Sequence, residues 1–378
     1  MKNKFKWIIS IFFLVLTPFI AIRHQLMGGG PSGSPSVDAL CPFGGLETLP
    51  TLLKNGTYIQ KITPSSFILL IAVIILTFVL GRAFCGYICP LGSIQSLITK
   101  LGKKLNIKQI TLNRFFDRIL RYAKYLVLFV VLFTTYKAGE LILRPYDPWA
   151  TFMHLTSGPE VFEEFLIGLI ILIAIFISSL FIERAWCRYF CPLGAALSLT
   201  SPLRIFKIKK NNSTCINCKS CTHNCPMGLE IHSKVSPSSI ECISCGECMT
   251  SCPINKTLEM KKGDISLSIN KVGITIILTL VLIIGGNMVI GNFKTSLSNQ
   301  TVLNENGTSN PDNIKAYMTL SDISKEFNID SKDLLKACNL PNDTDLNKSI
   351  KELKDDFAKK GIDFEPSTLR EIVKKIMK

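Results

Sequence analysis

The sequence has no phosphate-binding loop and no recognisable nucleophile motif, so nothing in it marks a complete enzyme with its own substrate. It is also poor in acidic residues: 28 Asp and Glu stand against 43 Lys and Arg, a formal net charge of +15. Such a balance can reflect nucleic-acid binding. Here it accompanies long apolar runs, and we attribute it to the basic residues that flank membrane segments on their cytoplasmic side. We therefore expect no nucleic-acid partner.

Long apolar runs are abundant. Hydrophobic residues make up 47% of the 378 residues, and the mean hydropathy is +0.32. Five runs have about the length that crosses a bilayer, although the second and third are at its lower limit. They lie at about residues 7–22, 66–80, 122–136, 162–182 and 272–290. The sequence predicts a mainly α-helical, multi-pass protein of the cell (cytoplasmic) membrane with about five spans. We interpret the first run as a retained signal-anchor, with a cleaved signal peptide as the alternative.

Basic residues predict the orientation. They are concentrated after the second and fourth runs, whereas the loops that contain Cys41 and Asp147 carry fewer of them. By the positive-inside rule, the N-terminus and the segment after the fourth run then lie in the cytoplasm. With five spans, the C-terminal tail lies outside the cytoplasm.

The most specific motif occurs twice between Cys215 and Pro253, as C-x-x-C-x-x-C-x-x-x-C-P. Such runs hold [4Fe–4S] clusters, and the fourth Cys of each run ligates the other run's cluster. Soft thiolates suit iron–sulfur chemistry. The sequence predicts one cluster on Cys215, Cys218, Cys221 and Cys252, and a second cluster on Cys242, Cys245, Cys248 and Cys225. A disulfide framework or two zinc sites are the alternatives, and the proline after each last Cys argues against both.

A second pair of motifs forms an internal repeat. The segment from Arg82 to Leu97 recurs from Arg184 to Leu199, and each copy contains R-A-x-C-x-x-x-C-P-L-G after an apolar run. Four-residue spacing puts two Cys on one face of a helix, and the following proline suits the first turn of a new helix. We expect a second metal or redox site where the two copies face each other, with neighbouring arginines favouring thiolates. Its candidate residues are Cys85, Cys89, Cys187 and Cys191. Local disulfides or inert thiols at a helix break are the alternative.

Cys41 and Cys338 lie outside these motifs. Cys41 belongs to C-P-F-G-G-L, for which a structural turn is the favoured interpretation and a redox or quinone-site role the alternative. Cys338 fits an apolar helical face in the tail. The predicted domains are a membrane domain with the duplicated hairpin at 1–205, an α+β ferredoxin domain at 206–262, a last span at 263–292, a linker at 293–317, and a helical domain of two repeated units at 318–378.

These motifs together resemble the NapH/NosR/YccM-type membrane-bound 4Fe–4S polyferredoxins. The resemblance covers about residues 1–292 and rests on the paired C-x-x-x-C-P motifs, the double ferredoxin motif and C-P-F-G-G-L-E-T-L at Cys41. It implies electron transfer between the membrane quinone pool and a redox partner protein, with the eight ferredoxin cysteines as cluster ligands. It leaves the role of the paired motifs open.

We therefore expect an electron-transfer subunit without catalytic residues, in contact with membrane lipid, a redox partner protein and a quinone such as menaquinone. One alternative is a redox-sensing membrane regulator. Another is an assembly factor that reduces a metal or thiol during the maturation of another enzyme.

Overall fold

The computed structural model covers the full chain. It describes residues 3–27, 34–35, 38–55, 62–110, 112–138, 141–155, 160–233, 239–295, 318–341, 344–348, 350–358 and 366–377, together with residues 59, 311, 314 and 364. The chain divides into two compact units. The first contains residues 1–22 and 37–294, and the second contains residues 23–36 and 295–378.

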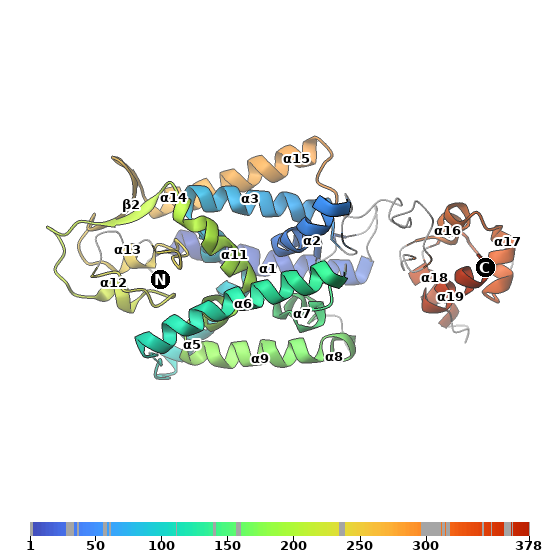
Figure 1. Ribbon diagram of the computed structural model, residues 1–378, viewed down its shortest axis with the longest axis horizontal. Coiled ribbons are helices and arrows are strands. Elements are labelled where there is room, and N and C mark those ends of the chain that lie inside the picture. Colours follow the sequence, from blue (N-terminus) through green and yellow to red (C-terminus); the bar gives the residue numbers. More distant parts are fainter. Residues whose placement is uncertain are drawn as a thin grey trace. The chain divides into compact units, whose positions relative to one another are not determined.

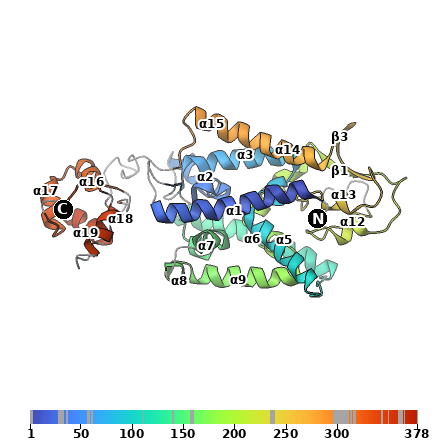
Figure 2. The ribbon, with the colours of Figure 1, turned by 180° about the vertical axis from the view of Figure 1, so that it is seen from behind.

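All five apolar runs are helical in the first unit, and Figures 1 and 2 show the helices beside one another. Three helical segments are long and apolar enough to cross a membrane: Lys4–Leu26, Arg114–Ala138 and Ile269–Val289. Two further apolar helices are shorter. The elements are α1 (Lys4–Met27), α3 (Pro64–Leu80), α6 (Arg114–Ala138), α9 (Leu166–Phe181), and α14 (Ile269–Leu280), which continues through the π-helix η4 (Val281–Gly285) into α15 (Gly286–Val289).

The sequence repeat is also a structural repeat. After α3, the chain forms the short helix α4 (Ala83–Tyr87) and then α5 (Pro90–Lys104). After α9, it forms α10 (Ala185–Tyr189) and then α11 (Pro192–Thr200). The predicted role of the prolines is confirmed, because Pro90 and Pro192 each begin a helix. A proline there costs no hydrogen bond, since the first amides of a helix have no intrahelical acceptor.

Shorter helices join these segments. They are η1 (Asp38–Leu40), α2 (Pro42–Asn55), η2 (Arg144–Tyr146), α7 (Pro148–His154), α8 (Glu160–Glu164) and η3 (Ser201–Leu203). The side chain of Asp147 caps α7 by accepting hydrogen bonds from the backbone amides of Trp149 and Ala150. Such a cap satisfies amides that the helix itself leaves free.

A small antiparallel sheet, in the order β1-β2-β3, brackets the double ferredoxin motif. Its strands are β1 (Lys207–Lys210), β2 (Leu258–Lys262) and β3 (Ile265–Leu267). Ile208 pairs with Met260, and both side chains are buried. Between β1 and β2 lie the short helices α12 (Ser220–His223) and α13 (Glu247–Ser251).

The second unit contains four described helices: α16 (Leu320–Phe327), α17 (Ser331–Ala337), α18 (Ile350–Ala358) and α19 (Pro366–Ile376). Their apolar residues, among them Leu320, Leu334, Leu353 and Leu369, form one buried core. Cys338 packs against this core, as its sequence pattern predicts. The predicted division of the tail into two repeated units stays a prediction.

Candidate functional site

Four of the ferredoxin-motif cysteines line a cavity whose empty space, open solvent included, is about 380 Å³. They are Cys225, Cys242, Cys245 and Cys248. We call it the inner cavity because three of these residues are at most 9% exposed and because apolar side chains such as Met227 and Ile243 complete its wall.

The other four line a second cavity, which we call the outer cavity and whose empty space, open solvent included, is about 360 Å³. They are Cys215, Cys218, Cys221 and Cys252. Cys218 is exposed and the other three are partly exposed. Each cavity thus gathers three cysteines from one motif and the fourth from the other.

The two motifs follow the same backbone path. The residue before the second Cys and the residue after it have positive φ in both motifs: Asn217 and Lys219 in one, Ser244 and Gly246 in the other. Lys219 and Gly246 then cap the short helices α12 and α13. Non-glycine residues adopt this conformation only where the surroundings hold it. The matched φ values therefore show that both loops bend around their cavities in the same way.

These residues fit a multi-iron cluster better than a single ion. Among the described residues, no three His, Cys, Asp or Glu side chains come close enough to ligate one metal ion. A cubane instead takes one thiolate for each of its four irons, so its ligands surround a volume. Two cavities, each bordered by four Cys, have that arrangement.

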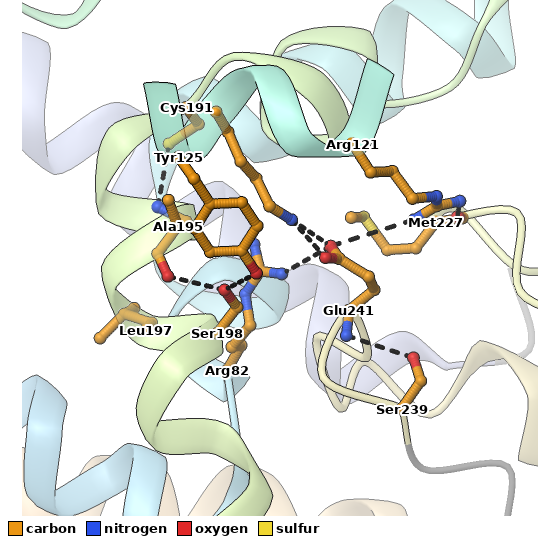
Figure 3. Close-up of polar contacts among 12 residues, drawn as sticks. Arg82, Arg121, Tyr125, Cys191, Ala195, Leu197, Ser198, Met227, Ser239 and Glu241 are labelled. Carbon is orange, nitrogen blue, oxygen red and sulfur yellow. Dashed lines mark hydrogen bonds and ion pairs between the residues drawn. The ribbon is translucent and has the colours of Figure 1, made fainter. Parts of the chain in front are cut away.

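A buried ion-pair network holds the inner cavity against the membrane helices (Figure 3). Glu241, the residue before Cys242, accepts hydrogen bonds from Lys124 of α6 and from Arg82, whose Nη1 lies 3.1 Å from Oε2. Arg82 and Lys124 are fully buried. Because unpaired charges are costly to bury, these three side chains depend on one another. Arg121 donates to the backbone oxygen of Met227 at 2.7 Å.

Two further cations lie beside the inner cavity. Arg204 interacts with the thiol of Cys242, and its Nη2 donates to the backbone oxygen of Ser239 at 2.5 Å. Burial lowers the pKa of Arg204 from its usual range. Lys6 of α1 pairs with Glu247 at 2.6 Å and acts electrostatically on Cys245. Positive charge therefore collects around the inner cysteines.

The paired C-x-x-x-C-P motifs come together, but not as two single helix faces. Cys85 lies in α4 and Cys89 in the turn that caps α5; Cys187 and Cys191 repeat this arrangement in α10 and before α11. The expectation that both Cys of a pair share one helix is thus wrong, because each helix ends between them. All four are free thiols.

Burial outweighs the nearby arginines at these thiols. It raises the pKa of Cys89 to about 12, with further contributions from Cys187 and Cys85, and it raises the pKa of Cys187 and Cys191 as well. The mutual effects show that the two pairs are close to each other. Arg184 lowers the pKa of Cys89, and Arg184 and Arg82 lower that of Cys187, as expected, but burial disfavours the charged form more strongly.

The two repeats exchange arginines. Arg184 of the second repeat donates to the backbone oxygen of Cys85 and, from Nε, to Ser96 Oγ at 2.9 Å. A Cβ on Gly92 would lie 2.8 Å from Arg184 Nη1, and a Cβ on Gly194 would lie 2.8 Å from Arg82 Nη2. The glycine of each C-P-L-G therefore leaves room for the arginine of the other copy.

The first pair of cysteines also adjoins the inner cavity. Cys85 packs in one buried cluster with Cys245 and Ile243. A Cβ on Gly86 would lie 2.5 Å from the backbone oxygen of Ile243. Helix α4 and the inner ferredoxin loop are therefore in direct contact.

Comparison with known proteins agrees with these sites. A family described as "4Fe-4S binding domain" matches residues 62–108 and 165–211, the two copies of the repeat. A family described as "4Fe-4S dicluster domain" matches residues 207–253. The models indicate iron–sulfur clusters, and their boundaries follow the repeat and the double motif.

Three relatives identify the family. The chain is 38% identical to the uncharacterized protein MJ0750 of Methanocaldococcus jannaschii over 52% of this chain and 76% of that protein. It is 32% identical to YccM of Escherichia coli (strain K12), over 54% of this chain and 57% of YccM. It is 29% identical to the ferredoxin-type protein NapH of Haemophilus influenzae, over 48% and 62% of the two chains.

The chain belongs to the NapH/NosR/YccM-type membrane-bound 4Fe–4S polyferredoxin family. The match spans little more than half the length of YccM. No solved structure matches this chain. The family models and relatives support an iron–sulfur electron-transfer protein, and the three long apolar helices support its association with a membrane.

Proposed function

We propose that this chain is a membrane-anchored electron carrier that relays single electrons between the quinone pool, or another membrane redox site, and a partner protein through two [4Fe–4S] clusters. The observation that carries the proposal is the pair of four-cysteine cavities. In this assignment, Cys225 joins the three cysteines of the second motif, and Cys252 joins those of the first. The chain then acts as an electron-transfer subunit rather than a complete enzyme.

Bound clusters would supply one-electron redox chemistry, and the chain sets its conditions. The inner cysteines exclude water, while Arg204 and Lys6 offset negative charge on their thiolates. Hydrogen bonds, net charge and exposure are the properties by which a protein tunes such a centre. The outer cysteines are open to solvent, which suits exchange with a partner protein.

We further propose five spans, with the ferredoxin motif on the cytoplasmic side and the C-terminal domain on the other. The three long apolar helices and the two shorter ones support the number. The basic residues after the second and fourth apolar runs support the orientation. The paired motifs form the proposed next redox or metal site, since Cys85 belongs to the same buried cluster as Cys245.

The test places the purified chain in liposomes that contain menaquinol and follows the clusters by electron paramagnetic resonance. We expect about eight irons per chain, four for each cluster, and clusters that change redox state with the quinone pool. Clusters that exchange electrons neither with the quinone nor with a soluble ferredoxin or flavodoxin would show that the chain is not a relay.

A matched variant tests the paired motifs. If they bind iron, replacing Cys85 and Cys187 by Ser lowers the iron content below that of the parent chain, while Cys338→Ser leaves it unchanged. Equal iron content in the parent chain and both variants would show that the paired motifs bind no iron.

A further inference from the structure

A third and larger cavity lies next to the second C-x-x-x-C-P motif. Its empty space, open solvent included, is about 820 Å³, and its wall combines residues of α2, α6, the segment 141–150 and the second motif. Trp186 and Pro192 belong to that wall, and Pro192 directly follows Cys191. Cys41 lines it as well. The turn that the sequence favours at Cys41 is therefore also part of a cavity wall.

The wall suits an amphipathic ring. Most of it is aliphatic or aromatic, with Val127, Val131 and Leu143 among its members. Among the described residues, the indole Nε1 of Trp149 is buried without a hydrogen-bond partner. An apolar cavity with a few convergent polar groups is the usual form of a small-molecule site.

Two carboxyl groups, Glu47 and Asp147, complete the polar part of the wall. Burial raises the pKa of Glu47 to about 8, helped by Asp147 and Asp38, and it raises the pKa of Asp147 to about 6. Arg144 opposes part of this effect at Asp147, although its guanidinium pairs with Asp38 at 3.1 Å. Both groups can therefore gain or lose a proton near neutral pH.

The paired motifs lie between the cavity wall and the inner ferredoxin loop along a chain of contacts. The cavity borders the turn at Cys191, whose thiol interacts electrostatically with that of Cys85. Cys85 shares a buried cluster with Cys245 of the inner cavity, and a Cβ on the neighbouring Gly86 would lie 3.3 Å from Cys245 Cα. The paired motifs therefore adjoin both the third cavity and the inner ferredoxin loop.

We propose that this cavity binds a quinol, with the Trp149 indole and the Glu47 and Asp147 carboxyls facing its oxygens. The proposal rests on the relay function proposed above and gives that relay its membrane-side substrate site. When the quinol becomes a quinone, its two O–H bonds break. The two protons would pass to the carboxylates of Asp147 and Glu47, and clusters held by the ferredoxin cysteines would supply the one-electron acceptors for the two electrons.

The test compares two valines of α6. Val131 lines the cavity, whereas Val130 is 42% exposed and lies outside its wall. We expect Val131→Phe to lower the rate at which decylubiquinol reduces the clusters by about tenfold or more, the loss that corresponds to a tenfold weaker site. Val130→Phe should keep the parent rate. Dithionite should still reduce the clusters in both variants.

Binding is measured separately from electron transfer. Trp149 and Trp186 line the cavity and Trp7 does not, so a Trp7→Phe chain keeps both reporters. Decylubiquinone should quench their fluorescence with saturation, and adding Val131→Phe should weaken that quenching. Quenching without cluster reduction would support the site and contradict the relay. A Val131→Phe chain that binds and reacts like the parent would overturn the site and leave the relay intact.

The carboxyls give a third readout. A raised pKa means that Glu47 is largely protonated at pH 7 and becomes a proton acceptor as the pH passes about 8. The quinol-driven rate should therefore rise with pH in that range. Glu47→Gln should abolish this rise, and Glu183→Gln, outside the cavity, should retain it. An unchanged profile in Glu47→Gln would exclude Glu47 as the acceptor.

Discussion

The inner and outer cavities share one motif, yet they differ in surroundings. The inner loop is buried, is preceded by an ion-paired Glu241, and is flanked by Arg204 and Lys6. The outer loop follows the same φ pattern, but Cys218 is exposed. The two loops therefore have the same ligand spacing but different electrostatic environments. The inner site is adapted to packing against membrane helices, and the outer site to solvent.

The largest expected effect is the loss of one cluster when the fourth cysteine of its cavity is replaced. Cys225→Ser should damage the inner cluster, and Cys252→Ser should damage the outer one. Each residue lines the cavity formed by the cysteines of the other motif. Electron paramagnetic resonance of the reduced proteins, with iron content, measures which signal disappears. The control is Cys338→Ser. If Cys252→Ser abolished only the inner signal, the crosswise ligand assignment would be wrong.

A second comparison uses the residue before each motif. Glu241→Gln leaves the buried Arg82 and Lys124 without a full counter-charge, so we expect a loss of about 3–5 kcal/mol in the free energy of unfolding. Thr214 is its exposed counterpart, and its hydroxyl pairs with Thr257 Oγ1 at 3.0 Å. Thr214→Val should cost about 1 kcal/mol. Chemical unfolding in detergent measures the loss of unfolding free energy in both variants. Equal losses would show that the residue before the motif contributes equally to the two loops.

The smallest effect concerns redox potential. Arg204→Met removes a positive charge beside Cys242, so the inner cluster should become harder to reduce. We expect its midpoint potential to fall on the order of 60 mV, equivalent to a tenfold change in a one-electron equilibrium. Potentiometric titration should show the outer cluster unchanged. Equal shifts at both clusters would mean that Arg204 does not distinguish them.

The sequence predicts the local features of this molecule well. The double motif shows which cysteines belong to which loop, and apolar periodicity locates the five helical runs, because both patterns act over a few residues. Pro90 and Pro192 correctly predict helix starts. The break between Cys85 and Cys89 agrees with the alternative of thiols at a helix break, which four-residue spacing alone could not distinguish from one continuous helix.

Features that join distant segments could not be predicted. Glu241 meets Lys124 across 117 positions and Arg82 across 159. The position of Lys124 inside the apolar run at 122–136 indicates that it needs a partner, but no local pattern identifies Glu241 as that partner. The third cavity is equally inaccessible to pattern reasoning, because Val131, Asp147 and Pro192 come together only through packing.

The arginine of each repeat packs against the glycine of the other repeat, and this contact limits the substitutions that the two repeats can accept. Arg184 occupies the space above Gly92, and Arg82 the space above Gly194. A larger residue at either glycine would require a residue shorter than arginine at the facing position of the other repeat. The two copies are thus free to diverge at their exposed apolar positions, whereas at these four positions each copy stabilises the fold of the other and neither could be lost alone.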